Sequence, residues 1–272
     1  MDRPLDRITS RRNPLVKQLR ELHTPRGRRD QGLLLLEGTH LLQEVRRLQL
    51  QPRQLVATPA WLQAHPQLAE APPHWPAWQP VSGEVLAAAA STEHPDGVVL
   101  TLAPPPPAPP IPAAAAPLLL VLDAIQDPGN LGTLMRTALA AGAAALWLAE
   151  GADPFQPKVL RASAGAALAL PIWRGRRAEL VERLQALLAQ RVQLVATLPP
   201  QPGVRPYWQI DWRPATALLL GSEGAGLAPE LQALAQQRVT IPHGGAVESL
   251  NVAVAAAPLL LERLRQERMP AN

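Results

Sequence analysis

The most informative segment of the chain is Ile241-Pro-His-Gly-Gly-Ala-Val-Glu-Ser-Leu-Asn-Val-Ala-Val-Ala255. It joins a predicted strand end, a glycine-rich turn and the start of a helix. We predict that Ser249 caps this helix, because serine side chains accept hydrogen bonds from the first N–H groups of helices. Exposed N–H groups at a helix start can also bind polar groups of a ligand. Taken alone, the segment is equally compatible with an ordinary strand-to-helix connection.

Two further segments also contain a predicted strand followed by a turn or a glycine-rich loop. The apolar run 118–125 predicts a buried strand, and Asp127-Pro-Gly-Asn130 then forms a turn that leads into a helix. Asn130 is placed at the cap of that helix, and Arg136 interrupts its apolar pattern. The run 217–227 predicts another buried strand with a glycine-rich loop that carries Glu223, but its glycines do not have the dinucleotide-binding spacing. Together the segments predict a ligand site at the strand ends of an α/β sheet.

In order and spacing, the three segments resemble the SpoU (TrmH) family of RNA ribose 2′-O-methyltransferases. The matching patterns are Asp127-Pro-x-Asn130-x-Gly132-x-x-x-Arg136-x-Ala138, Gly221-x-Glu223-x-x-Gly226-Leu227, and the Ile241 to Ala255 segment. Upstream, residues 8–17 and 36–44 resemble the family's amino-terminal substrate-binding domain. The resemblance covers nearly the whole chain and is weakest between residues 50 and 117.

The resemblance implies an α/β fold of two domains. A small L30e-like RNA substrate-binding domain is expected over 1–103, a Pro/Ala-rich linker over 104–117, and a parallel-sheet methyltransferase domain of SPOUT type, with a trefoil knot, over 118–272. The stretch 103–117 holds eight prolines, which is typical of an extended spacer, although a ligand for a proline-recognising partner is the alternative.

The residue patterns themselves predict alternating elements. In the amino-terminal part we expect strands at 54–57 and 97–102 and helices at 13–22 and 39–48. In the carboxy-terminal part we expect strands near 118–124, 145–149, 192–197, 216–221 and 238–242. Helices are expected at 131–141, 157–164, 177–190, 228–235 and 249–266, the last of them kinked at Pro258.

The resemblance also implies a reaction, the S-adenosylmethionine-dependent methylation of a ribose 2′-hydroxyl in structured RNA, either rRNA or tRNA. It places the cofactor at Gly221, Ile241 and Leu250, and the catalytic group at Asn130, Arg136, Glu223, Ser249 and Asn251. The family mechanism gives Arg136 the role of a base that acts through the RNA phosphate. Because a guanidinium has a pKa above about 12, we favour a phosphate-orienting role. The alternative for each is a structural role: Asn130 and Ser249 as helix caps, Glu223 as a solvated loop acid, and Arg136 as a surface arginine paired with a carboxylate.

The first thirty residues are strongly basic. They contain nine basic and four acidic side chains, a net charge of +5, whereas the whole chain carries +4. Such a segment is often only a solvated face, but beside an RNA-modifying domain an RNA-binding surface is the better interpretation. The candidates for contact with RNA are Arg11, Arg12, Lys17, Arg26, Arg28 and Arg29.

Composition narrows the remaining possibilities. The chain has no cysteine, which excludes disulfides and thiolate sites, and its six histidines are dispersed, so we predict no metal site. No apolar run approaches the roughly 20 residues that span a bilayer, and the charged amino terminus lacks a signal-peptide pattern, so we expect a cytoplasmic protein. The resemblance also implies that the protein forms a homodimer. The alternatives are a catalytically inactive RNA-binding protein of the same fold and an α/β enzyme unrelated to RNA.

Overall fold

The computed structural model describes residues 5–108, 116–244 and 246–269, so half of the predicted linker, residues 109–115, lies outside the described residues. The chain forms two compact units. The amino-terminal unit extends to Pro105 and includes residues 153–168, and the carboxy-terminal unit contains residues 106–152 and the chain from Ala169 onward. Residues 153–168 cluster with the amino-terminal unit through ion pairs of Asp153 with Arg28 and of Arg161 with Glu37.

The amino-terminal unit is built on a four-stranded mixed sheet in the order β1-β4-β2-β3. Both β1 and β2 pair with β4 in antiparallel register, and β2 pairs with β3 in parallel register. Proline at the first helical turn fixes the start of several helices, and Asn13, Thr24 and Thr58 cap three of them. The elements are α1 (Pro14–Glu21), α2 (Pro25–Gln31), β1 (Leu34–Glu37), α3 (Thr39–Arg47), β2 (Pro52–Ala57), α4 (Pro59–Ala64), α5 (Pro66–Ala69), β3 (Trp78–Pro80), α6 (Gly83–Ala89), β4 (Val98–Leu102) and α8 (Pro157–Ala162).

The carboxy-terminal unit contains a seven-stranded sheet in the order β7-β6-β5-β10-β8-β11-β9, and every neighbouring pair is parallel. This arrangement confirms the predicted parallel α/β class. The elements are β5 (Leu118–Asp123), α7 (Pro128–Ala140), β6 (Ala145–Ala149), β7 (Ile172–Gly175), α10 (Arg177–Ala189), β8 (Gln193–Thr197), β9 (Arg205–Pro206), the 3-10 turn η2 (Tyr207–Gln209), β10 (Thr216–Leu220), α11 (Pro229–Leu234), β11 (Gln237–Thr240) and α12 (Val252–Arg268). The short helix α9 (Ala166–Ala169) precedes β7, and its first three residues belong to the amino-terminal unit.

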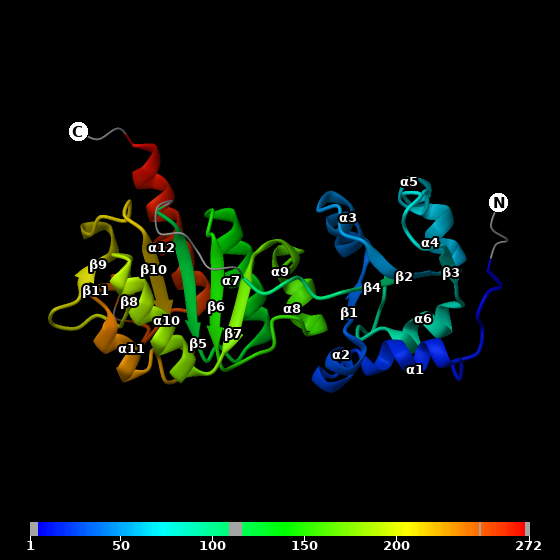
Figure 1. Cartoon of the computed structure of the whole chain (residues 1–272), viewed down its shortest axis with the longest axis horizontal. Coiled ribbons are helices and arrows are strands. Elements are labelled where there is room, and N and C mark those ends of the chain that lie inside the picture. Colours follow the sequence, from blue (N-terminus) through cyan, green and yellow to red (C-terminus); the bar gives the residue numbers. More distant parts are fainter. Residues whose placement is uncertain (1–4, 109–115, 245, 270–272) are drawn as a thin grey trace. The chain divides into compact units, whose positions relative to one another are not determined.

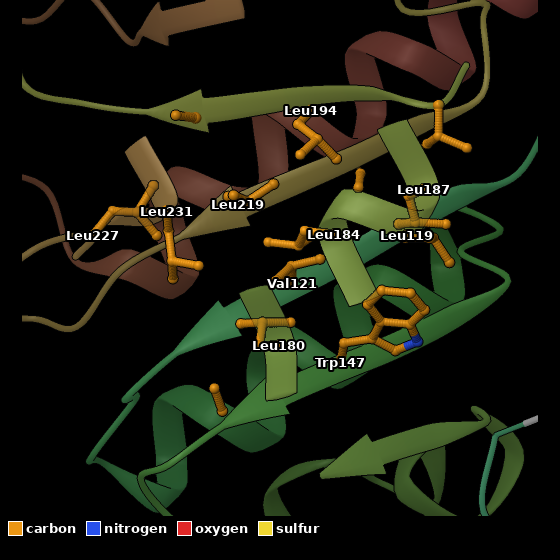
Figure 2. Packing of buried hydrophobic residues seen from close by; sticks show 14 of the residues in the cluster. Leu119, Val121, Trp147, Leu180, Leu184, Leu187, Leu194, Leu219, Leu227 and Leu231 are labelled. Carbon is orange, nitrogen blue, oxygen red and sulfur yellow. The ribbon is translucent and has the colours of Figure 1, made fainter. Parts of the chain in front are cut away.

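Helices cover both faces of this sheet. Figure 1 shows α10 and α11 on one face and α7 and α12 on the other. In Figure 2 the α10 leucines Leu180, Leu184 and Leu187 pack over strand residues such as Leu119 and Leu219, and these side chains are buried. Because neighbouring strand residues point to opposite faces, the residues between them form the core under α7 and α12. This double burial explains why the central strands appear in the sequence as continuous apolar runs.

The last helix, α12, packs against α7 and continues through Pro258 from Val252 to Arg268. Proline removes the N–H that would bond to the carbonyl of Val254, so that carbonyl loses its helical partner. The expected kink at Pro258 stays a prediction. No helix among the described residues is long and apolar enough to cross a membrane.

Candidate functional site

A pocket of about 600 Å³ opens at the carboxyl ends of β8, β10 and β11, where parallel α/β sheets commonly bind ligands. We call it the strand-end pocket. Its walls are formed by residues 197–200 at the end of β8, by residues 220–227 at the end of β10, by Gln232 of α11, and by Thr240, Ile241, His243, Glu248, Ser249, Leu250, Val252 and Ala255. All three residues predicted to hold the cofactor, Gly221, Ile241 and Leu250, therefore line one pocket.

The loop after β10 folds tightly back on itself. Ser222 and Gly226 exchange two backbone hydrogen bonds, of 3.1 and 3.0 Å, and Gly226 has a φ of 69°. A Cβ atom at Gly221 would lie 2.0 Å from the Gly226 carbonyl carbon and 2.0 Å from the Leu227 nitrogen. Only glycine fits at this position, because the backbone of one loop arm packs directly on the other.

A polar network joins the three sequence segments. The Asn130 amide donates to a carboxylate oxygen of Glu223 at 2.9 Å, and the Asn251 amide donates to Asn130 Oδ1 at 2.9 Å. The backbone N–H groups of Gln126 and Asp127 also donate to Glu223, at 3.3 and 3.4 Å. Glu223 thus ties the loop after β10 to the turn after β5, and Asn251 ties the start of α12 to the same turn.

The helix caps differ from the predicted ones. The predicted cap of α7 was wrong, because Asp127 is the N-cap and its carboxylate accepts from Asn130 N–H at 2.7 Å. This leaves the Asn130 side chain available for the network. The prediction of Ser249 as a cap was also wrong, because α12 begins at Val252 and Asn251 caps it by accepting from Ala253 N–H at 2.9 Å and Val254 N–H at 3.3 Å. Ser249 is exposed in the preceding loop and lines the pocket.

The pKa of Glu223 is lowered from its ordinary value of 4.5. Partial burial raises the pKa of this carboxyl, but the hydrogen bonds from the Asn130 amide and from nearby backbone N–H groups stabilise the charged form and prevail. Glu223 is therefore an exposed loop acid whose charged form is stabilised by hydrogen bonds from the turn after β5.

This shift predicts a pH dependence of stability. Since the pKa of Glu223 is lower in the folded than in the unfolded chain, its contribution is present above about pH 4.5 and is lost as the pH falls through the folded value. We expect the Glu223→Gln variant to lose unfolding free energy less steeply than wild type on acidification below that pH. Chemical denaturation at a series of pH values measures the two slopes. Identical slopes would contradict the assigned role of the charge.

Arg136 lies on the exposed side of α7, nine residues after the N-cap Asp127. Within the described ranges of the chain, its guanidinium forms no hydrogen bond or ion pair. An arginine held on a rigid helix without an internal partner is available to an anionic ligand such as a phosphate.

Asp123 is a residue of this region that the sequence reasoning missed. Its carboxylate is 1% exposed, accepts from Arg177 Nε at 2.8 Å and accepts from Ala228 N–H at 3.0 Å. It therefore fixes the far end of the loop after β10, whose near end is held by Glu223. The signal in the sequence was a single acid at the end of an otherwise apolar strand.

His243 lines the pocket, and its Nδ1 lies 2.8 Å from the carbonyl oxygen of Ile241. A bond to that carbonyl requires Nδ1 to carry the proton, so in the neutral ring Nε2 is the acceptor. No group of three or more His, Cys, Asp or Glu residues in the described part of the chain is arranged to hold a metal ion.

The predicted RNA-contact residues do not form a uniform group. Arg11, Arg12, Lys17, Arg26 and Arg29 are exposed. Arg28 is 5% exposed, donates to the carbonyls of Leu22 and His23, and forms a 2.5 Å ion pair with Asp153. Because its guanidinium is buried and bonded within the amino-terminal unit, Arg28 is not available to bind RNA, and its prediction as an RNA contact was wrong.

Comparison with known proteins agrees with this geometry. The SpoU rRNA Methylase family matches residues 117–261, and an MRM3-like substrate binding domain matches residues 13–100. The chain is 44% identical over 262 residues to an uncharacterised tRNA/rRNA methyltransferase of Synechocystis sp., a match that covers 96% of this chain and 94% of the relative. It is 33% identical over 262 residues to the 23S rRNA (guanosine(2553)-2′-O)-methyltransferase RlmP of Bacillus subtilis, covering 94% and 98% of the two chains.

Solved structures extend the agreement to the fold. The AdoMet-bound rRNA methyltransferase from Sinorhizobium meliloti matches with a TM-score of 0.79 and 30% sequence identity, over 98% of this chain and 99% of that one. The two family matches and this structure together cover nearly the whole chain. The chain belongs to the SpoU family, and it is an RNA ribose 2′-O-methyltransferase that uses S-adenosylmethionine as its methyl donor.

Proposed function

We propose that the strand-end pocket holds S-adenosylmethionine and that the network of Asn130, Glu223 and Asn251 fixes its outer wall. The observation that carries this proposal is the convergence of Gly221, Ile241 and Leu250 on one pocket of about 600 Å³. That volume suits a ligand of this size. Gly221 supports the fit, since any side chain there would collide with the loop backbone that forms the wall.

The residues of the chain have separate tasks in this proposal. When bound, S-adenosylmethionine supplies an electrophilic methyl group on a sulfonium. Ile241 and Leu250 provide apolar contact for adenosine, and Ser249 holds the loop between β11 and α12 against the donor. Asn130 and Asn251, oriented by Glu223, hold that loop in a fixed position relative to the start of α7. Such pre-positioning supplies much of the rate enhancement of a two-substrate reaction.

Arg136 acts on the RNA in this proposal. Its exposed guanidinium binds a phosphate next to the target ribose and holds the 2′-hydroxyl in place. The positive charge also stabilises negative charge that develops on the 2′-oxygen as the hydroxyl proton passes to solvent water. An arginine acts more readily in this way than as a base, because its own pKa is above about 12.

We further propose that the substrate is 23S rRNA. The support is the likeness to RlmP over nearly the full length of both chains, together with a substrate-binding domain at residues 13–100. The exposed basic residues of the amino-terminal unit, Arg11, Arg12, Lys17, Arg26 and Arg29, supply charge for phosphate contacts.

Purified wild-type enzyme and labelled S-adenosylmethionine test the substrate. Total 23S rRNA, 16S rRNA and tRNA are prepared from a strain that lacks the gene, and label transferred to each is counted. We expect incorporation into 23S rRNA, at one mapped position that loses its 2′-O-methyl group in the deletion strain. Incorporation into tRNA alone would contradict the rRNA assignment.

We also propose that the enzyme is a cytoplasmic homodimer. The cysteine-free composition supports the location. An exposed apolar stripe supports the dimer. Val254 and Leu261 are exposed on one face of α12, with the half-buried Pro258 between them at helical spacing, and Leu139 is exposed on the adjacent α7. A second copy of the chain would bury this stripe twice across a two-fold axis.

The dimer predicts the effect of one substitution. Leu261→Asp places two unpaired carboxylates in the interface, and we expect the dimer dissociation constant to rise by at least about 100-fold. Size-exclusion chromatography with light scattering at micromolar concentration should then give a monomer. Leu5→Asp is the matched control, because Leu5 and Leu261 are 47% and 44% exposed. A Leu261→Asp dimer as tight as wild type would contradict the proposed interface.

A further inference from the structure

Thr197, the last residue of β8, has an unusual hydroxyl group. Its Oγ1 atom is buried, and within the described residues it has no hydrogen-bond partner. Only one other buried side-chain polar atom in the described part of the chain, Gln31 Oε1 in the amino-terminal unit, shares that state. Buried polar atoms are nearly always bonded, so each exception calls for an explanation.

The register of the sheet places the Thr197 side chain on the pocket side. Leu194, Ala196 and Leu198 of the same segment belong to the core under α10 and α11. Since successive strand residues alternate between faces, Thr197 points to the opposite face, which is covered by α12. Ala196 pairs with Leu219 of β10, so Thr197 lies beside Leu220. Thr197, Leu220, Val252 and Ala255 all line the strand-end pocket.

Apolar residues contribute much of the pocket wall. Leu220 lies beside Thr197 in the sheet, and Leu198, Ile241 and Val252 line the same pocket, together with polar residues such as Thr240 and His243. A flat aromatic ring with hydrogen-bonding edges suits such a region, provided that one polar group meets an edge. Rotation about χ1 moves the threonine hydroxyl among three staggered positions, so it can turn toward a ligand in the pocket.

We propose that the Thr197 hydroxyl binds an edge of the adenine ring of S-adenosylmethionine and is left without a partner when the pocket is empty. Thr197 is then a donor-binding residue that destabilises the free protein slightly and strengthens the complex. This inference rests on the proposed placement of the donor in the strand-end pocket. It assigns a function to a residue outside the three sequence segments that define the rest of the site.

The Thr197→Val substitution removes the hydroxyl and keeps the branched shape, so it separates the two effects. We expect Thr197→Val to weaken S-adenosylmethionine binding about tenfold by calorimetry. The melting temperature of the ligand-free protein should rise by about 2–4 °C, because an unpartnered buried hydroxyl is gone. Thr197→Ser keeps the hydroxyl and should bind the donor within about threefold of wild type. Binding of 5′-methylthioadenosine, which lacks the amino-acid end, should weaken as much as that of the donor.

Thr216→Val is the matched control on the neighbouring strand. Thr216 is fully buried at the amino end of β10, and its Oγ1 donates to the Pro214 carbonyl at 2.8 Å and accepts from Gln193 at 2.8 Å. Thr216→Val should lower the melting temperature, because these hydrogen bonds are lost, and should leave donor affinity unchanged.

Two results would overturn the inference. One is unchanged donor affinity in folded Thr197→Val, which would make the hydroxyl irrelevant to binding. The other is weaker binding of S-adenosylmethionine with unchanged binding of 5′-methylthioadenosine, which would place the contact at the amino-acid end. A wild-type protein that binds neither ligand would instead overturn the proposed donor pocket itself.

Discussion

The Arg136→Ala enzyme is expected to transfer methyl groups about 100- to 1000-fold more slowly than wild type under single-turnover conditions. Removing one fixed cationic group from the place where negative charge develops typically has an effect of this size. Stability should hardly change, because Arg136 is exposed and forms no hydrogen bond or ion pair with the described residues. Donor affinity should also stay at the wild-type value, since Arg136 is not among the residues that line the strand-end pocket.

Two further variants make this expectation specific. Arg136→Lys keeps the charge but loses the planar two-pronged donor, so we expect an intermediate rate. Arg268→Ala removes an exposed arginine from the last turn of α12 and should retain the wild-type rate. If Arg136→Ala and Arg268→Ala were equally active, Arg136 would have no part in the reaction.

The second large effect concerns Gly221. We expect Gly221→Ala to lose at least tenfold in affinity for S-adenosylmethionine and about 1–3 kcal/mol or more in unfolding free energy. The added Cβ would lie 2.0 Å from backbone atoms of Gly226 and Leu227, which cannot move away as a flexible side chain can. The loop would have to open, and with it the hydrogen bonds between Ser222 and Gly226. Calorimetry and chemical denaturation measure the two losses.

Gly224 supplies the control within the same loop. A Cβ atom at Gly224 would meet nothing within 4 Å, and Gly224 is not among the described glycines of positive φ. Gly224→Ala should therefore bind the donor as wild type does and unfold at a similar denaturant concentration. Equal behaviour of the two variants would show that the loop adapts freely, and the close approach at Gly221 would then have no functional meaning.

The carboxy-terminal unit was largely predictable from the sequence, because its strands are buried on both faces. The strand at 145–149 was predicted with its observed bounds, and the other four predicted strands of this unit end within two residues of the observed ones. The edge strands β7 and β9 were missed. They are short and partly exposed, so they lack the continuous apolar run that identifies a central strand. In the amino-terminal unit, β1 and several short helices were missed for a similar lack of length.

The caps were harder to predict, because several polar residues compete at each helix start. Asp127 and Asn130 both precede the apolar pattern of α7, and so do Ser249 and Asn251 before α12. In each pair the unselected residue has another task. Asn130 bonds to Glu223, and Ser249 lines the pocket. Local propensity identifies the residues that are able to cap a helix, whereas the tertiary contacts decide which of them does.

Contacts between distant segments were beyond the sequence patterns altogether. Arg28 looked like one of a row of surface arginines, but its partner Asp153 lies 125 residues away and buries it. The roles of Asp123 and Thr197 likewise depend on which strands are neighbours in the sheet. The trefoil knot rests on the family resemblance and stays a prediction. The three sequence segments were sufficient to predict the candidate site, whereas the hydrogen bonds between them became visible only in the structure.

The position of the transferred methyl group tests the account most directly. Substrate RNA from a strain that lacks the gene is incubated with wild-type enzyme and labelled S-adenosylmethionine, digested to nucleosides and analysed by mass spectrometry. The account predicts one labelled nucleoside whose added mass lies on the ribose, with alkaline cleavage blocked at that position because the 2′-hydroxyl is methylated. Label on a base, or no label with an enzyme that binds the donor, would contradict it.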